Sequence, residues 1–198
     1  MMSRSSLAAR LHGVRSLSLV SHAKRFYCRT MSLSTSKKPS LHEALNKVSW
    51  LLGKWVGEGC GVYPTISPFM YGEEVIFDHV GQPMLSYNSR TWNLKEGNPM
   101  HQELGWLKIK PGTSSVAFLL AQNTGLTEIE EGEVDGHKIR LVSHTIGRTS
   151  FNKDPKVVKI ERLYTLKDPD TLEMECFMET NNTDHQKHLH ITYKKVKE

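Results

Sequence analysis

The spacing of the apolar residues is the strongest constraint on what this chain can fold into. Apolar side chains occupy every second position from Leu172 to Met178, and Glu173 and Glu175 stand between them. An alternation of period two is typical of a strand with one buried and one solvated face. The sequence therefore predicts a half-buried antiparallel strand here.

Similar short runs recur along the chain at intervals of about ten residues, as in barrels and sandwiches. They cover Glu74–Val80, Met84–Trp92, Glu103–Ile109, Val116–Ala121, Thr127–Val134, Lys138–His144, Val157–Leu166 and His188–Val196. Turn signals separate them at Lys110–Thr113, Asp135–Gly136, Asp168–Asp170 and Asn181–Asp184. Nine or ten short strands predict an all-β fold. A closed barrel is favoured because it leaves no exposed edge strand, and such a barrel has room for a small ligand.

One helix is expected before the strands. Ser40 and Glu43 have the spacing of a capping box, apolar residues follow at helical intervals to Leu52, and Gly53 comes next. We therefore expect one short amphipathic helix at the start of a domain that covers residues 39–198.

The net charge of +5 is distributed unevenly. Residues 1–40 contain eight of the 26 Lys and Arg residues and no acidic residue. Residues 41–198 therefore contain 18 basic and 21 acidic residues, which gives this part of the chain a net charge of −3. A slightly acidic domain lacks the attraction for phosphates that nucleic-acid binding requires. We therefore expect no nucleic-acid partner.

Residues 1–38 have the composition of a mitochondrial transit peptide, rich in Ser and Arg and free of acids. Apolar residues recur at helical spacing from Leu7 to Leu17, and Arg25–Tyr27 resembles a processing site. The alternative is a disordered extension, and translation from Met31 would leave a cytoplasmic or nuclear protein.

Membrane insertion and disulfide bonding are not expected. The longest apolar run, Val116–Ala121, has six residues and is too short to cross a bilayer. The three cysteines, Cys28, Cys60 and Cys176, are too few and too scattered for a disulfide framework or a cysteine zinc site. A reducing compartment inside the cell is the better interpretation.

Gly53, Trp55, Gly57 and Gly59 occupy alternate positions of the first expected strand. Glycines on one face of a strand let another backbone or a ligand come close, and both interpretations stay open. The tryptophan resembles the one that closes the floor of lipocalin-like barrels. A phosphate loop is excluded because no Gly-Lys-Ser/Thr ending and no helix follow.

Histidines gather near the C-terminus at His185, His188 and His190. On a regular strand the last two share a face. They could form a hydrogen-bonded pair, part of a zinc site, or the axial ligand of a haem iron. The alternating Met174, Cys176 and Met178 would suit a flat, polarisable macrocycle or an ordinary core.

Weaker candidates are Met100–His101 and Tyr63–Thr65, which could face a pocket or hydrogen-bond a ligand at the barrel rim. The sequence contains no nucleophile-and-base signature such as Gly-x-Ser-x-Gly.

Taken together, these residues resemble the nitrobindin family. The likeness rests on Gly53-x-Trp55-x-Gly57-x-Gly59, Tyr63–Thr65, Pro99–His101, Ala121–Gly125 and His188–Lys195, and it covers 44–198. It is greatest to the nitrobindin domain at the C-terminus of animal THAP-domain proteins. The Cys and His spacing of the zinc-binding THAP module does not precede the barrel here, so we expect no DNA-binding role.

The resemblance implies a ten-stranded antiparallel, calycin-like barrel that holds haem b at one mouth. It implies His188 as the axial ligand and Thr65, Met100, His101 and Met178 as pocket residues. The implied activities are nitric oxide binding and isomerisation of peroxynitrite to nitrate. The alternative is a non-catalytic, lipocalin-like carrier of an apolar ligand.

The assignment of His188 raises a question of register. If His188 points inward on a regular strand, then Leu189, Ile191 and Tyr193 point outward. The opening helix or a second copy of the chain, in a homodimer, would then cover them, or a bulge changes the register.

Overall fold

A computed structural model describes residues 38–197 of the chain. The expected leader, with its amphipathic stretch, Arg25–Tyr27 and Met31, lies outside the described residues.

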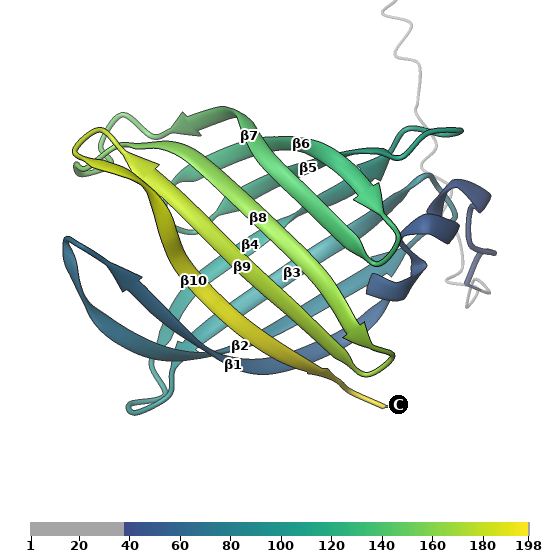
Figure 1. The fold of residues 1–198 in the computed structure, drawn as a ribbon, viewed down its shortest axis with the longest axis horizontal. Helices are drawn as coiled ribbons and strands as arrows, with labels where there is room; N and C mark the ends of the chain where they lie inside the picture. The colour runs from purple at the N-terminus through teal and green to yellow at the C-terminus, as the bar shows by residue number, and fades with distance from the viewer. Residues whose placement is uncertain (1–37, 198) are drawn as a thin grey trace, which may run out of the picture. The chain divides into compact units, whose positions relative to one another are not determined.

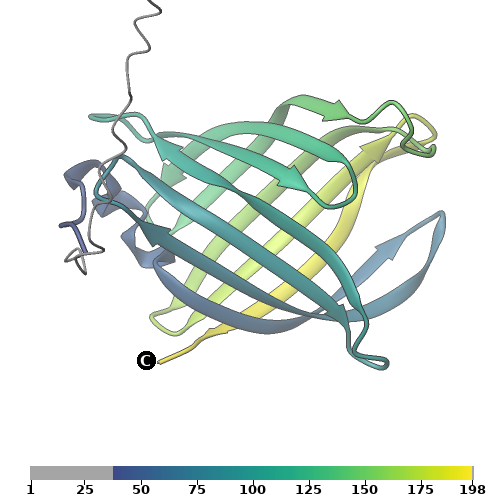
Figure 2. The ribbon, with the colours of Figure 1, turned by 180° about the vertical axis from the view of Figure 1, so that it is seen from behind.

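Ten antiparallel strands form a closed barrel in which each strand pairs with its neighbours in sequence and the first pairs with the last. Figure 1 shows the barrel from one side and Figure 2 from behind. The predicted all-β, ten-stranded antiparallel barrel is confirmed. The strands are β1 Gly53–Tyr63, β2 Ile66–His79, β3 Met84–Asn93, β4 Pro99–Ile109, β5 Ser115–Gln122, β6 Leu126–Asp135, β7 Lys138–Arg148, β8 Val157–Asp168, β9 Thr171–Thr180 and β10 Thr183–Lys195.

The strand with the clearest alternation behaves as predicted. In β9 the side chains of Leu172, Met174 and Cys176 are buried inside the barrel, whereas Glu173 and Glu175 are only partly covered. The alternation thus assigns the inner and outer faces of β9 correctly.

The predicted α-helix and its capping box are wrong. The segment forms two short 3₁₀ helices, η1 Glu43–Lys47 and η2 Ser49–Leu51. The residue that caps η1 is His42, whose Nδ1 accepts a hydrogen bond from the Ala44 amide at 3.1 Å. The physical reason is spacing, because a 3₁₀ helix has three residues per turn. Its period aligns Leu45, Val48 and Leu51 on one face, and all three are fully buried.

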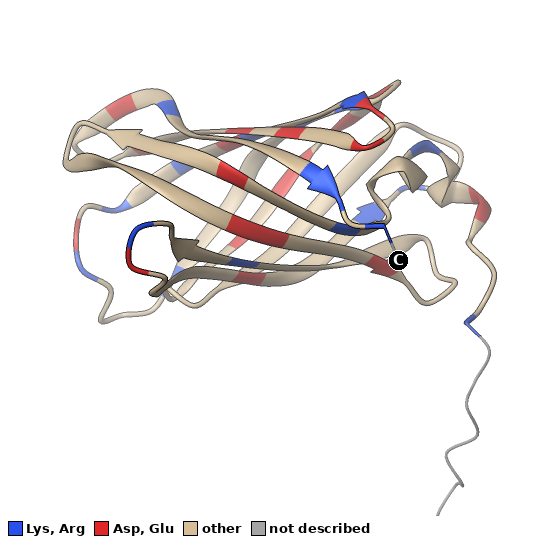
Figure 3. Ribbon diagram, turned by 90° about the horizontal axis from the view of Figure 1, so that it is seen from below, with Lys and Arg blue, Asp and Glu red and all other residues tan. Residues whose placement is uncertain are grey.

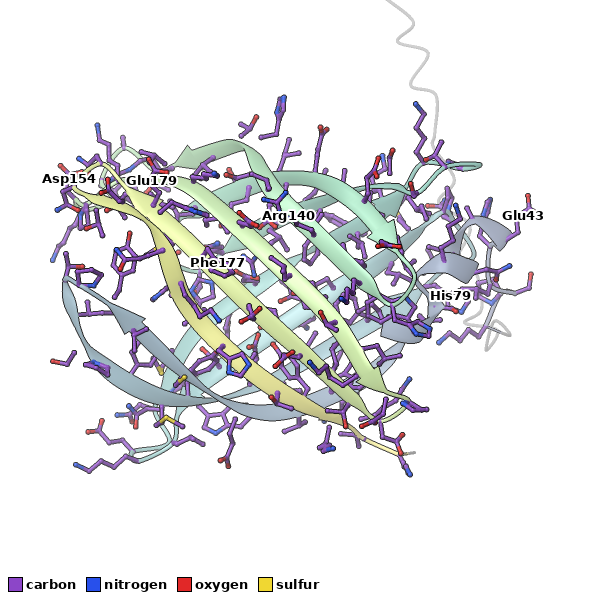
Figure 4. The ribbon with its side chains drawn as sticks, viewed as in Figure 1. Glu43, His79, Arg140, Asp154, Phe177 and Glu179 are labelled. Atoms are coloured by element: carbon purple, nitrogen blue, oxygen red, sulfur yellow. The ribbon has the colours of Figure 1, made fainter. Side chains whose placement is uncertain are left out.

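These helical turns lie at one end of the barrel, which we call the floor. Figure 4 places Glu43 and His79 at this end and Asp154 and Glu179 at the opposite end, the mouth. The indole of Trp55, at the start of β1, donates a hydrogen bond to the Leu51 carbonyl at 2.7 Å. The ring is fully buried, as expected for a floor tryptophan.

The glycines of β1 allow close approach of another backbone. A Cβ on Gly57 would lie 2.2 Å from the carbonyl oxygen of Thr192 in β10, and one on Gly59 would lie 2.6 Å from that of His190. Both distances are below any normal contact. Of the two interpretations of this motif, close packing of β1 against β10, which closes the barrel, is the one that the contacts support.

Charged residues of both signs are interspersed along the strands of the barrel, as Figure 3 shows. In the described part of the chain, residues 38–197, no helix is long and apolar enough to cross a membrane.

Candidate functional site

A cavity of about 340 Å³ opens at the mouth of the barrel, and we call it the mouth cavity. Most of its wall is apolar, formed by Phe69, Tyr71, Met100, Leu126, Val157, Ile160, Met174, Cys176, Met178 and Leu189. Its polar lining residues are Glu73, Thr91, His101, Glu103, Gln122, Thr124, Arg162 and His188. The cavity therefore combines a large apolar surface with a few placed polar groups, as small-ligand sites do.

A bulge in β10 turns His188 into this cavity. Lys187 pairs with Phe177 and Leu189 with Cys176, the next residue of β9, so His188 is the extra residue. Because of this shift, His188 and Leu189 both line the mouth cavity, while Ile191 and Tyr193 are fully buried. The bulge, one of the three explanations considered for the register of β10, is the correct one.

His188 lies just beyond the point where β1 and β10 separate. The main-chain pairing of β1 with β10 ends at Gly61 and Leu189. Just beyond it, Nδ1 of His188 lies 3.2 Å from the Val62 carbonyl oxygen. A carbonyl only accepts hydrogen bonds, so Nδ1 carries the hydrogen and Nε2 keeps its lone pair.

The surroundings of His188 favour the neutral ring. Burial lowers the pKa of His188, partly offset by the hydrogen bond to Val62. The Tyr63 ring lies edge-on to it at a centroid distance of 5.2 Å and the Phe69 ring at 6.4 Å. A neutral imidazole that donates one N–H to a carbonyl and keeps the other nitrogen unprotonated is the arrangement that metal-binding histidines adopt.

The other two histidines of the cluster lie outside the barrel. Nε2 of His190 lies 2.9 Å from Oε1 of Glu173, and His185 stacks on the Phe177 ring at 5.9 Å. The expectation that His188 and His190 share a face is wrong because the bulge separates them. Because His188 lines the cavity while His185 and His190 lie outside the barrel, the three histidines cannot bind one zinc ion.

The remaining predicted pocket residues are only partly brought together. Met100, His101 and Met178 line the mouth cavity. Thr65 does not line it, because this residue is exposed in the turn between β1 and β2. Its neighbour Tyr63 donates a weak hydrogen bond from its hydroxyl to the Met178 carbonyl at 3.4 Å.

The sulfur-bearing wall of β9 is formed as expected, since Met174, Cys176 and Met178 all line the cavity. Burial raises the pKa of Cys176 to about 12, so its thiol stays protonated and packs like a small apolar side chain.

A layer of buried charged residues forms the base of the cavity, and sequence reasoning missed it. This charged layer consists of Glu73, Glu103, Glu128, Glu130 and Arg162. Arg162 donates two hydrogen bonds to Glu103, at 2.8 and 3.0 Å, and one to Glu130 at 2.8 Å. Its nearest approach to Glu128 is 3.6 Å. The Arg162 guanidinium is thus the positively charged neighbour of three carboxyl groups.

The four carboxyl groups differ in their protonation. Burial favours a raised pKa for Glu103, but Arg162 and His101 outweigh it and hold the pKa at about 2. Burial raises the pKa of Glu73 to about 7, despite hydrogen bonds from Ser89 and Tyr193. Burial and the neighbouring Glu130 raise the pKa of Glu128. The layer therefore contains a permanent anion beside groups that hold protons near neutral pH.

The alternation of inner and outer positions along a strand could have revealed this layer from the sequence. On β4, His101 and Glu103 share the inner face, whereas Leu104 and Trp106 are 59% and 54% exposed. Once His101 is assigned to the pocket, strand alternation places Glu103 inside as well.

A haem group fits these residues. His188 offers an unprotonated Nε2, and the apolar and thioether side chains suit the faces of a macrocycle. Tyr71 lines the cavity, and its buried hydroxyl has no hydrogen-bond partner among the described residues. A buried polar group of this kind usually has a partner, which here would be a bound ligand or an ordered water molecule.

Known proteins share this fold and sequence. Residues 44–195 match the family described as "THAP4-like, heme-binding beta-barrel domain". The chain is 44% identical over 167 residues to a human protein named peroxynitrite isomerase THAP4, a match that covers 83% of this chain and 29% of the human protein.

A smaller relative and a solved structure match over nearly their whole length. The Arabidopsis thaliana protein named peroxynitrite isomerase Rv2717c is 39% identical over 155 residues, covering 77% of this chain and 89% of the relative. The crystal structure of Rv2717c from M. tuberculosis is 36% identical and superimposes with a TM-score of 0.73, covering 80% of this chain and all of that one. This chain belongs to the THAP4-like, haem-binding β-barrel family, the nitrobindins.

Proposed function

We propose that this protein holds haem b in the mouth cavity through His188, binds nitric oxide, and isomerises peroxynitrite to nitrate. The observation that carries the proposal is the inward-turned His188, with Nδ1 anchored on Val62 and Nε2 available. The chain spans 29% of the human relative but 89% of the Arabidopsis one, and both are named for the same activity. The part common to all three is the barrel.

Bound haem would supply the iron at which the peroxynitrite O–O bond breaks and the fragments recombine as nitrate, without net electron transfer. The chain itself supplies binding, orientation and access. His188 offers a neutral nitrogen because burial lowers its pKa, and the Val62 carbonyl fixes the direction of the ring. The apolar wall, including Met174 and Met178, excludes water from the ligand side.

Hemin titration tests the axial assignment. Hemin added to the purified protein should give a Soret band, and His188→Ala should abolish or strongly shift it. His190→Ala is the matched control, because this ring lies two residues away on the outer surface and pairs with Glu173. An unchanged Soret band in His188→Ala would remove the axial assignment.

Stopped-flow measurement of peroxynitrite decay tests the activity. The decay rate should rise in proportion to the concentration of ferric, haem-loaded protein, with nitrate as the product. If haem binds and the decay does not accelerate, the isomerase proposal fails and nitric oxide binding is left to be tested by titration of the ferrous protein.

The alternative is a non-catalytic carrier of an apolar ligand, as in lipocalins. The carrier proposal predicts that a fluorescent fatty-acid analogue binds in the mouth cavity and that His188→Ala leaves its affinity unchanged. Hemin binding that depends on His188 favours the haem protein instead.

A homodimer stays a prediction. Ile191 and Tyr193 lie inside the barrel, so no second copy is needed to cover them. Sedimentation of the purified protein will give the oligomeric state.

A further inference from the structure

A histidine and a glutamate form a pair in the wall of the mouth cavity. His101 and Glu103 are two residues apart on the inner face of β4, and Nε2 of His101 lies 3.1 Å from Oε1 of Glu103. In the ring of strands, β4 is separated from the His188 strand β10 by three strands on one side and five on the other. His101 therefore faces the cavity from nearly the opposite wall to His188.

Glu103 is held rigidly in this pair. Arg162 binds both of its carboxylate oxygens, and the Tyr87 hydroxyl donates to Oε2 at 3.2 Å. Because the pKa of Glu103 is about 2, the group is an anion throughout the neutral range. An ionised carboxylate only accepts hydrogen bonds.

The backbone of His101 is fixed as well. A register shift between Arg90 and Trp92 leaves Thr91 unpaired in the ladder between β3 and β4. Its hydroxyl accepts a hydrogen bond from the His101 amide at 2.7 Å and lies 3.0 Å from the His101 carbonyl, to which it donates. The imidazole is thus held at its backbone by Thr91 and at its ring by Glu103.

This arrangement decides which ring nitrogen carries the hydrogen. Facing an obligatory acceptor, Nε2 of His101 must be the protonated nitrogen. No hydrogen-bond partner of Nδ1 is found among the described residues.

We propose that Glu103 is a positioning residue, which keeps the hydrogen of His101 on Nε2 and so presents Nδ1 as a hydrogen-bond acceptor to the ligand in the mouth cavity. The ligand class that this acceptor recognises is the protonated form of a small nitrogen oxyacid, such as peroxynitrous acid. This inference rests on the proposed function for the identity of the ligand, but the state of His101 can be measured without it.

The chain offers a matched control on its outer surface. Nε2 of His190 contacts Oε1 of Glu173 at 2.9 Å, the same atoms at a similar distance, and this carboxylate also pairs with Lys167 at 2.9 Å. Glu173→Gln therefore makes the same chemical change at a histidine that does not face the cavity.

Nitrogen-15 NMR of the haem-free protein tests the first part, at a pH where the imidazole is neutral. Unaltered His101 should be almost entirely the Nε2–H tautomer. Glu103→Gln should produce a mixture of tautomers, because the amide of glutamine can also donate to Nε2. Glu173→Gln should leave His101 unchanged. Finding the Nδ1–H tautomer in the unaltered protein would overturn the proposal, and that measurement needs no variant to fold.

The stretching frequency of carbon monoxide on the ferrous, haem-loaded protein tests the second part, because it responds to the local electric field. A His101 ring able to turn an N–H toward the cavity should lower it, so Glu103→Gln should lower the frequency and Glu173→Gln should not. Equal frequencies in all three proteins would overturn the role of Nδ1. Failure of hemin to bind any of them would instead refute the proposed function, with the NMR result unaffected.

Discussion

Replacing Arg162 with methionine should destabilise the protein strongly at neutral pH. Arg162 is 6% exposed and is the one cation in the charged layer, where it binds Glu103 through two hydrogen bonds and Glu130 through a third. Methionine fills a similar space without the charge, so the variant leaves buried carboxylates without their partner. Breaking a buried ion pair from one side costs about 3–5 kcal/mol.

The pKa of Glu103 gives an independent magnitude. Its value of about 2, against an ordinary 4.5, corresponds to about 3 kcal/mol of stability at 1.36 kcal/mol per pH unit. Because the pKa is lowered in the folded state, this stability is fully present above pH 4.5 and is lost as the pH falls toward 2. The cost of Arg162→Met should therefore be about 3–5 kcal/mol at pH 7 and clearly smaller at pH 3.

Urea unfolding at the two pH values measures this difference. The control is Arg140→Met, which removes a similar contact, 2.7 Å from Arg140 Nε to Glu161, on the outer face of β7. The Arg140 side chain, labelled in Figure 4, is 66% exposed. Its loss should cost less than about 1 kcal/mol. Equal costs for the two arginines at pH 7, or a cost at Arg162 that grows toward pH 3, would refute the reasoning.

Three further predictions follow from single features. Gly61→Ala should weaken hemin binding in a hemin titration, because a Cβ there would lie 2.1 Å from the Phe69 ring in the cavity wall. The control is Gly112→Ala, in an open turn, which shows whether a general loss of stability alone weakens hemin binding. Equal hemin affinity in Gly61→Ala and the unaltered protein would count against the packing argument. Glu73→Gln should gain stability relative to the unaltered protein as the pH rises from about 4.5 to 7 in urea unfolding, because over this range the unfolded state of the unaltered protein has released the Glu73 proton while the folded state, with its pKa of about 7, still holds it; a difference that does not vary with pH would contradict this. The full chain with a C-terminal fluorescent tag should enter mitochondria and the chain that lacks residues 1–30 should not; the same distribution for both would refute the transit peptide.

The strands and their order were predictable because one face of each is buried. Alternation in β9 assigned Leu172, Met174 and Cys176 to the inside, and turn residues marked most of the strand ends. The pattern is ambiguous where apolar residues occupy the outer face. On β4, Leu104 and Trp106 are exposed while Glu103 is inside together with Leu107, so hydrophobicity alone does not assign the two faces of this strand.

Two local features could not be predicted because tertiary packing decides them. The spacing of Leu45, Val48 and Leu51 suits a 3₁₀ helix only when a barrel floor exists for all three to cover. The bulge at His188 depends on its neighbour, since β9 pairs Phe177 and Cys176 with residues on either side of it. A single sequence cannot show which residue of β10 the ladder skips.

The charged layer divides the interior into two parts that can change independently. Along β2, the inward residues pass from Tyr71 at the cavity through Glu73 to Val75 in the apolar floor, and β4 passes likewise through Glu103 to Leu107. Substitutions in the mouth can reshape ligand preference without disturbing the packing below the layer, because the two share few side chains. A lineage could therefore explore new ligand chemistry at the mouth while the floor keeps the barrel folded.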